Sequence, residues 1–207
     1  PLAEVSMAWL PQTGRVDLRF YGGDLSKVTA SADNCLRLVG EHVWGRNADT
    51  PVSVLHGLLR LHKLTLSAAE SCTGGLLQKM VTDQAGASDV FLGGVISYSN
   101  ALKQSLLRVK PETLAENGAV SETCAREMAE GIKHLTESQT AISITGVAGP
   151  DGGTPQKPVG TVCFGFSVLN RAWSLTQTFN GDRESIRHKA AEFALLHLIK
   201  HLQGTRI

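Results

Sequence analysis

The chain has 207 residues, of which 42% are hydrophobic, so it can bury one full-sized core and a smaller second one. Its 20 basic and 19 acidic residues give a formal net charge of +1, which excludes the strongly basic surface of a nucleic-acid-binding or membrane-surface protein. No segment approaches the ~20 consecutive apolar residues that span a bilayer, and the four cysteines lie far apart, as expected in a reducing cytoplasm. We therefore expect a small, soluble, neutral-to-acidic partner, with no nucleic acid and no membrane.

The first expected elements form a small N-terminal unit. Residues Arg15 to Phe20 alternate between apolar and polar side chains, which predicts a half-buried strand. A helix with apolar residues at three- and four-residue steps follows from Leu25 to Val39, with Asp24 as its N-cap. A polar stretch after this helix indicates a boundary, which gives a subdomain at 1–48 and a main domain at 49–207.

The main domain alternates strands and helices. Thr50 and Pro51 have the pattern of an N-cap followed by a proline in the first helical turn. Hydrophobic periodicity then predicts, in chain order, a buried strand at 64–69, a helix at 76–81, a strand at 95–98, helices at 100–107 and 121–135, a strand at 140–145, a hairpin of strands at 161–168 and 173–179, and a helix capped by Asp182. This mixture of crossover and hairpin connections favours a three-layer α/β/α domain around a mixed sheet.

A turn of small residues separates the strand at 64–69 from the next helix, and it contains Ser71. A hydroxyl at such a junction is expected to be exposed, and the amides at the helix start lack partners within the helix. These amides can hold a phosphate or an oxyanion. Two interpretations stay open for this segment alone: Ser71 is a nucleophile, or Ser71 or Thr73 only caps the helix.

A catalytic Ser71 needs a base, because serine is a poor nucleophile at neutral pH. The expected helices contain most of the histidines, and none is an evident triad member: His56, His62, His134, His188, His197 and His201. Lys103 is a different candidate, since a lysine desolvated in a pocket can lose enough of its usual pKa of ~10.4 to act as a base. The other interpretation is an ordinary exposed lysine in the first turns of a helix.

Two further segments contain residues that could bind a ligand or take part in catalysis. The glycine-rich stretch 146–153 supplies permissive backbone for a ligand, but it matches neither the GxxxxGK[ST] phosphate loop nor a well-placed GxGxxG. Asp151 within it has no second carboxylate or histidine at metal-ligand spacing, so we expect it to form a turn. Cys72 is an alternative nucleophile, because a thiol at a helix N-terminus is activated more readily than a hydroxyl.

Four segments together are similar to one known family: 69–75 (AESCTGG), 97–100 (SYSN) with Lys103, 143–153 (SITGVAGPDGG), and 181–183 (GDR). They occur in the family's order, and the similarity extends from about Leu55 to Leu202. The sequence resembles the CinA C-terminal domain family of competence/damage-inducible proteins, whose domain also occurs alone as nicotinamide-nucleotide amidohydrolase. The resemblance implies hydrolysis of the carboxamide of nicotinamide mononucleotide to nicotinic acid mononucleotide and ammonia, with no metal and no cofactor.

The resemblance also implies roles for single residues. Ser71 matches the family's serine nucleophile, Lys103 its proposed base, and Tyr98 a tyrosine beside them. Candidates for contacts with the oxyanion and the nucleotide are Thr73, Gly74, Gly75, Asn100, Thr145, Gly146 and Gly149, with Arg183 for the phosphate. Dimers are usual for this family, so a cytoplasmic homodimer is implied.

The segment at 1–48 resembles the small KH-type linker domain that precedes this module in longer family members. It lacks a GxxG clamp and its charges balance, so RNA binding is not expected. Longer members also carry a larger N-terminal domain. Since the chain starts at Pro1 without a methionine, we expect it to be part of something longer.

Two alternatives to the Ser/Lys enzyme stay open. The first is a catalytically silent binding or scaffold domain of a competence or DNA-damage response protein. The second keeps the amidase activity but uses Cys72 as the nucleophile. The presence of both Ser71 and Lys103 favours the enzyme, because a binding module would not need this pair.

Overall fold

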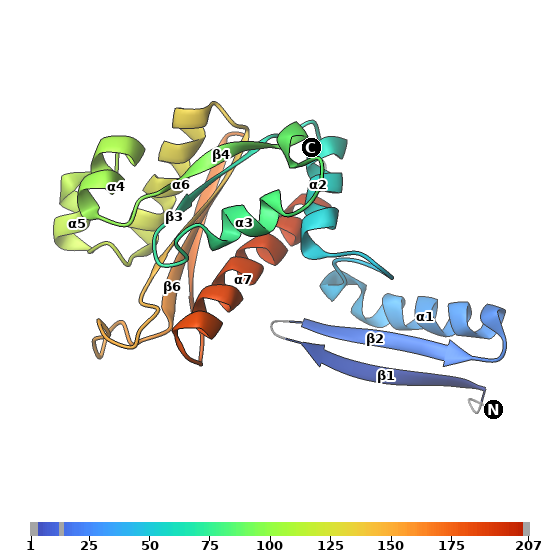
Figure 1. The fold of residues 1–207 in the computed structure, drawn as a ribbon. Helices are drawn as coiled ribbons and strands as arrows, with labels where there is room; N and C mark the ends of the chain where they lie inside the picture. Colours follow the sequence, from blue (N-terminus) through green and yellow to red (C-terminus); the bar gives the residue numbers. More distant parts are fainter. Residues whose placement is uncertain (1–3, 13–14, 205–207) are drawn as a thin grey trace. The chain divides into compact units, whose positions relative to one another are not determined.

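The computed structural model describes residues 4–12 and 15–204 (Figure 1). Contacts along the chain divide it into two compact units, Pro1–Asp49 and Thr50–Ile207, and each unit has its own architecture. Within the described ranges, no helix combines the length and the hydropathy needed to cross a lipid bilayer.

The first unit consists of a hairpin and a helix. Strands β1 (Val5–Gln12) and β2 (Arg15–Gly22) pair antiparallel, and α1 (Leu25–Val39) follows, with the short 3-10 helix η1 (Gly40–His42) after it. The sequence predicts β2 and α1, whereas β1 has no counterpart among the expected elements. It is one strand of a two-stranded sheet with no fully buried residue, so its side chains follow no clear burial pattern.

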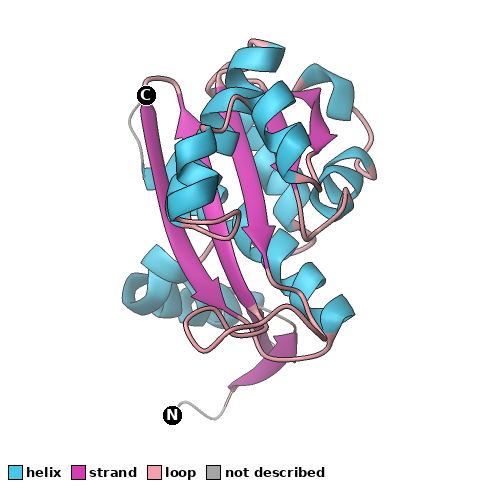
Figure 2. Ribbon diagram, turned by 90° about the vertical axis from the view of Figure 1, so that its left-hand side faces the viewer, coloured by secondary structure: helices cyan, strands magenta, loops and turns pink. Residues whose placement is uncertain are grey.

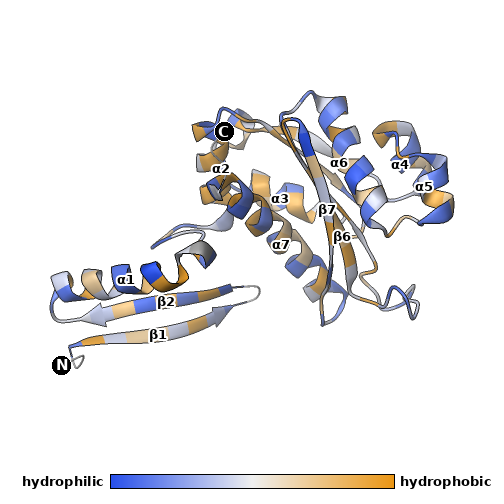
Figure 3. Cartoon of the chain, turned by 180° about the vertical axis from the view of Figure 1, so that it is seen from behind, coloured by the Kyte–Doolittle hydropathy of each residue, from blue (hydrophilic) through white to orange (hydrophobic). Residues whose placement is uncertain are grey.

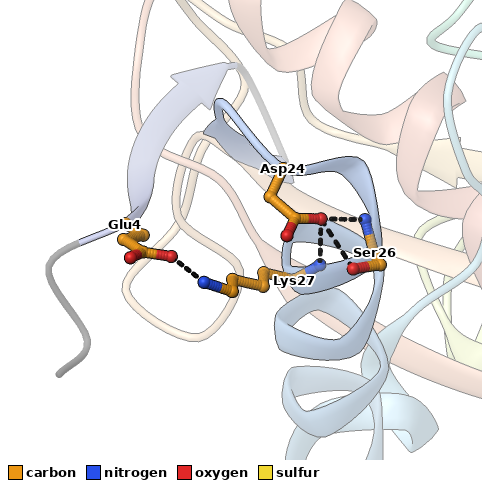
Figure 4. Close-up of polar contacts among 4 residues, drawn as sticks. All are labelled: Glu4, Asp24, Ser26 and Lys27. Atoms are coloured by element: carbon orange, nitrogen blue, oxygen red, sulfur yellow. Dashed lines mark hydrogen bonds and ion pairs between the residues drawn. The ribbon is translucent and has the colours of Figure 1, made fainter.

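Helix α1 begins at the predicted cap. Asp24 Oδ1 accepts hydrogen bonds from the amides of Ser26 (2.9 Å) and Lys27 (3.3 Å), and the Lys27 amine forms an ion pair with Glu4 (Figure 4). No residue of α1 is fully buried, and a cavity of about 870 Å³ lies between the helix, the hairpin and residues 42–49. The first unit therefore has a thin core of its own.

The second unit is built around a five-stranded mixed sheet (Figure 2). Its strands are, in sheet order, β4 (Phe91–Ile96), β3 (Leu66–Glu70), β5 (Thr140–Gly146), β6 (Thr161–Val168) and β7 (Arg171–Thr178). β3 is parallel to both of its neighbours, whereas β5, β6 and β7 pair antiparallel. The predicted mixed sheet is thus confirmed.

Helices cover both faces of this sheet (Figures 1 and 3). One face carries α2 (Pro51–Leu61), α3 (Leu76–Thr82) and α7 (Arg183–Gly204), and the other carries α4 (Asn100–Leu107), α5 (Pro111–Glu116) and α6 (Glu122–Thr136). The Ser143 hydroxyl of β5 donates to the Ala125 carbonyl of α6, whereas Phe164 of β6 lies 4.8 Å from Phe193 of α7 between ring centroids. The unit therefore has the three layers that the sequence predicts.

The predicted helix caps are present. The side chains of Thr50 (3.1 Å), Ser121 (3.2 Å) and Asp182 (2.8 Å) each accept a hydrogen bond from the amide three residues later. Each cap satisfies an amide that has no partner within its helix. The caps therefore fix where α2, α6 and α7 begin.

Besides β1, two elements of the second unit, β4 and α5, differ from the expectation. β4 starts at Phe91 rather than Val95 and ends at Ile96, before Ser97 and Tyr98. Its glycines hide the strand pattern, and Gly94 is required because a Cβ there would lie 2.3 Å from the Ala68 carbonyl oxygen. The short helix α5 was not expected, since six residues are too few to show helical periodicity.

The carboxyl ends of the parallel strands β4, β3 and β5 lie side by side. Three segments follow directly from these ends: Ser97 and Tyr98 after β4, the Ser71 turn after β3, and the glycine-rich loop after β5. Loops at this edge of an α/β sheet are the common location of ligand sites. The fold therefore gathers the sequence-predicted site residues at one edge.

Candidate active site

Ser71 begins the turn that connects β3 to α3. Its amide donates to the Ile144 carbonyl of β5 (2.9 Å), which ties the turn to the sheet. Gly74 and Gly75 have φ angles of 60° and 94°, a left-handed conformation that glycine adopts without strain. The expectation of an exposed hydroxyl is wrong: Ser71 is only 8% exposed, since the Lys103 side chain lies against it.

The Lys103 side chain extends from α4 to residues 71–75, the turn between β3 and α3 that we call the serine turn. Its Nζ lies 3.0 Å from Ser71 Oγ, 2.7 Å from the Ser97 carbonyl oxygen and 3.4 Å from the Tyr98 carbonyl oxygen. The residue is 1% exposed. Lys103 is therefore a buried amine, and the interpretation as an ordinary surface lysine is wrong.

Burial lowers the pKa of the Lys103 amine, because the charged form loses its hydration. The nearby thiols of Cys124 and Cys72 act more weakly in the opposite direction. Among the described residues, no carboxylate forms an ion pair with this amine. A neutral amine can direct its two hydrogens to the two backbone carbonyls, so that its lone pair faces the Ser71 hydroxyl, the arrangement needed to accept a proton.

The alternative nucleophile, Cys72, is held in its unreactive form. Burial raises the pKa of its thiol to about 12, and the charge of Glu70 acts in the same direction. A thiolate is the reactive species of cysteine, and this thiol stays protonated near neutral pH. The geometry therefore favours Ser71 over Cys72.

The amides after Ser71 are not equally free. The Gly75 amide donates to the Glu70 carboxylate (2.9 Å), and the Gly74 amide donates to the Ser71 carbonyl (3.1 Å). The expectation that both amides serve a substrate is therefore wrong. Within the described chain, the amides of Cys72 and Thr73 donate to no backbone carbonyl, so these two are the candidate oxyanion donors.

The Tyr98 carbonyl oxygen faces Lys103, whereas the Tyr98 side chain faces Arg183. Its ring is exposed, and its hydroxyl accepts a hydrogen bond from Arg183 Nη2 (3.2 Å) rather than one from Lys103. Arg183 Nη1 also donates to the Gly149 carbonyl (2.7 Å). Arg183 thus connects the segment after β4 with the glycine-rich loop, and Tyr98 is linked to the Ser71–Lys103 pair only through its backbone.

Residues of the glycine-rich loop and of the strand end before it lie beside the site, and their side chains or backbone are needed for packing. The buried Thr145 hydroxyl donates to the Ala119 carbonyl (2.8 Å), so this hydrogen is already used. A Cβ at Gly146 would lie 2.7 Å from the Thr161 carbonyl oxygen, and Gly149 has a φ of 76°. These two glycines are required by strand packing and by backbone conformation.

Arg187 is a site residue that the sequence reasoning missed. It stands four residues after Arg183 on α7, and its Nη2 donates to the Thr73 carbonyl in the serine turn (2.7 Å). Residues four apart share one face of a helix, and this spacing was the available signal. Asn100, in contrast, is exposed as the first residue of α4.

Groups of three or more histidine, cysteine or acidic side chains that could hold a metal ion do not occur in the described ranges. The site's polar groups are instead a hydroxyl, an amine, backbone amides and two guanidinium groups. Such a set suits nucleophilic attack on a carbonyl carbon of an anionic substrate.

The chain is similar in sequence to several known proteins. A CinA-like protein of Thermotoga neapolitana is 48% identical over 171 residues, which cover 83% of this chain and 42% of the relative. A putative competence-damage inducible protein of Thermoanaerobacter pseudethanolicus is 43% identical over 82% of this chain and 41% of the relative. The chain thus spans about two fifths of the length of these curated relatives.

Solved structures give the same family. A competence damage-inducible protein A from Klebsiella pneumoniae is 35% identical, with a TM-score of 0.73 over 75% of this chain and 97% of that one. A competence/damage inducible protein from Agrobacterium tumefaciens is 33% identical, with a TM-score of 0.69 over 77% of this chain and 99% of that one. The family model described as the CinA C-terminal domain matches residues 49–202. The chain therefore belongs to the CinA C-terminal domain family.

Proposed function

We propose that the second unit is an amidohydrolase that converts nicotinamide mononucleotide to nicotinic acid mononucleotide and ammonia. The observation that carries the proposal is the 3.0 Å contact between Lys103 Nζ and Ser71 Oγ in a buried site. Burying an amine without an ionic partner destabilises a fold, so such a group is typical of a functional site. A serine that needs a base supplies that use.

The reaction proceeds through an acyl-enzyme. Neutral Lys103 accepts the Ser71 proton while Oγ attacks the carboxamide carbon, and the amides of Cys72 and Thr73 stabilise the oxyanion. Protonated Lys103 then donates its proton to the departing nitrogen, and ammonia leaves as the Ser71 ester forms. Water then attacks this ester while Lys103 accepts a proton from it, and Lys103 returns that proton to Ser71 Oγ as the ester C–O bond breaks, which regenerates Ser71 and releases nicotinic acid mononucleotide.

The substrate phosphate is recognised by arginine rather than by a helix start. The first amides of α3 already donate to Glu70, so they cannot also bind a phosphate. Arg183 and Arg187 lie on one face of α7, with Arg187 reaching the serine turn and Arg183 the glycine-rich loop. Guanidinium groups match phosphate geometry, so these two are the proposed phosphate contacts.

The contact between the buried Lys103 amine and Ser71 also argues against the alternative of a catalytically silent scaffold domain. A protein that only binds partners has no use for a desolvated amine against a buried hydroxyl, and an apolar pair would pack there at lower cost. Several relatives are named for competence or damage, which is said of those proteins and does not describe a reaction. The KH-type likeness of the first unit is likewise a proposal, which rests on the sequence resemblance.

The direct test is to incubate the purified protein with nicotinamide mononucleotide and to measure ammonia and nicotinic acid mononucleotide. We expect both products in equal amounts from the wild-type chain and neither from the Ser71→Ala variant. A wild-type protein that releases no product would refute the proposed activity. Product formation that continues in Ser71→Ala would refute the mechanism.

A further inference from the structure

Glu70 is a buried acidic residue that the chemistry above does not use. It is the last residue of β3, is 0% exposed, and forms no ion pair within the described chain. A buried charge is costly unless hydrogen bonds compensate for the lost water. Its Oε2 accepts from the amides of Gly75 (2.9 Å) and Leu77 (3.2 Å), and its Oε1 accepts from the amide of Gln78 (2.9 Å).

These hydrogen bonds close the serine turn from both sides. The N-cap position of α3 is Gly75, which has no side chain that could satisfy the amides of the first turn. Glu70 supplies this cap from the end of the preceding strand. Ser71 and the amides of Cys72 and Thr73 are therefore held in a short loop whose two ends are joined by the Glu70 carboxylate.

A second chain of contacts leads from the Glu70 backbone to the base. The Glu70 carbonyl accepts a hydrogen bond from the Ser97 amide (2.8 Å), and the Ser97 carbonyl accepts one from Lys103 Nζ (2.7 Å). Glu70 is thus covalently joined to the nucleophile and is two hydrogen bonds away from the base. The Glu70 side chain thus holds the serine turn, and the backbone carbonyl of the same residue holds the segment that contacts the base.

From this arrangement we infer that Glu70 is a positioning residue for Ser71 and Lys103, an inference that rests on the proposed amidohydrolase function. Its carboxylate fixes the loop that presents Ser71 and the oxyanion amides in one geometry. Groups held in advance of the reaction need no reorganisation in the transition state. Because Glu70 does not touch the substrate, its loss should lower kcat and leave KM nearly unchanged.

The variant that tests this is Glu70→Gln, which keeps the size of the side chain. Glutamine replaces one acceptor oxygen by an NH₂ group, so a donor would face the amides of α3. A misplacement of about 1 Å can cost on the order of 100-fold in rate, so we expect kcat to fall by roughly 10- to 100-fold.

The matched control is Val81→Ala, a fully buried position in the last turn of the same helix. It should lower Tm at least as much as Glu70→Gln does, yet keep kcat within about twofold of wild type. Glu70 has only a structural role if Glu70→Gln keeps the wild-type kcat. The same conclusion follows if the two variants lose equal kcat at an equal drop in Tm.

A second measurement does not depend on the natural substrate. A small fluorophosphonate reacts with an activated serine: Oγ bonds to phosphorus, fluoride leaves and the base takes the proton. The labelling rate of Ser71, located by peptide mass spectrometry, should fall in Glu70→Gln and not in Val81→Ala. If that difference appears while the wild type leaves nicotinamide mononucleotide unchanged, the proposed substrate is wrong and the positioning role stands. Equal labelling of the wild type and both variants would overturn the positioning role.

Discussion

The indole nitrogen of Trp173 donates a 3.2 Å hydrogen bond to Nε2 of His197. The bond joins β7 to α7, where the His197 ring also lies 4.7 Å from the Phe166 ring between centroids. Nε2 can accept this hydrogen bond only while it carries no proton. The contact therefore requires a neutral imidazole.

We expect this contact to weaken the fold at acid pH. Burial lowers the pKa of His197, and the charges of His201 and Lys200 act in the same direction. A folded pKa below the unfolded value of ~6.5 means that the unfolded chain binds more protons. The free energy of unfolding should therefore fall as pH drops from ~6.5 towards the folded pKa, with a slope of at most about 1.4 kcal/mol per pH unit.

Urea unfolding at a series of pH values between 7 and 5 measures this effect. The variant His197→Phe should be less stable at pH 7, because the Trp173 indole loses its acceptor, and should show a shallower loss towards pH 5. The same slope in both proteins would assign the acid sensitivity to other groups, such as the buried His56, whose pKa burial also lowers.

Ser71→Ala should reduce deamidation by at least about 1,000-fold and leave the fold intact, because it removes the attacking oxygen and keeps a small residue in the turn. Cys72→Ser should retain most of the activity, since the buried thiol is not the nucleophile. Steady-state ammonia release checks both variants, with circular dichroism as the test of folding. An active Ser71→Ala together with an inactive Cys72→Ser would reverse the assignment.

Lys103→Ala and Lys103→Arg should be similarly impaired. Arginine keeps the charge and most of the reach, but its pKa above ~12 prevents it from accepting a proton at neutral pH. In the wild type, kcat/KM should rise with pH, with a midpoint below the ordinary lysine pKa because burial lowers the pKa of this amine. A Lys103→Arg enzyme that stays active and retains this rising limb would exclude Lys103 as the base.

Nicotinamide riboside should be a much poorer substrate than the mononucleotide, because it lacks the phosphate that Arg183 and Arg187 are proposed to bind. Arg187→Gln should lower kcat/KM for the mononucleotide by roughly 10-fold or more, and should lower the value for the riboside by a smaller factor that reflects the lost hydrogen bond to the Thr73 carbonyl. Lys189→Gln, on the same helix, is the control, because this amine donates to the Asn180 carbonyl outside the site. Equal kcat/KM values for the two substrates would remove the phosphate site from the proposal.

Local patterns predict much of this fold. The strand before Ser71, the caps at Thr50, Ser121 and Asp182, and the helix that contains Lys103 are visible because periodicity and capping act over a few residues. β1 and β4 are less visible. The exposed strand β1 lacks the burial alternation that identifies a strand. In β4 burial does alternate, but the sequence does not show it, because Leu92 and Ile96 are exposed apolar residues and two glycines stand between them.

The site was predictable to a smaller extent. The family resemblance identified Ser71 and Lys103 as candidate site residues. Their contact could not be inferred from local patterns, because it depends on the pairing of β3 with β4, which joins distant parts of the chain. The role of Glu70 is of the same kind. Its capping of α3 could not be inferred from spacing, because the sequence indicates only an acidic residue at the end of an apolar strand.

The candidate site lies at the carboxyl ends of β4, β3 and β5, so none of its residues lies at the amino ends of these strands. Residues 83–90 and 137–139 connect elements at these amino ends, and Asp83 and Glu137 are exposed there. A dye or a solid support attached through Glu137→Cys would therefore sit remote from Ser71 and Lys103. The second unit thus carries the candidate site at the carboxyl ends of its parallel strands and exposed attachment points at the opposite ends of the same strands.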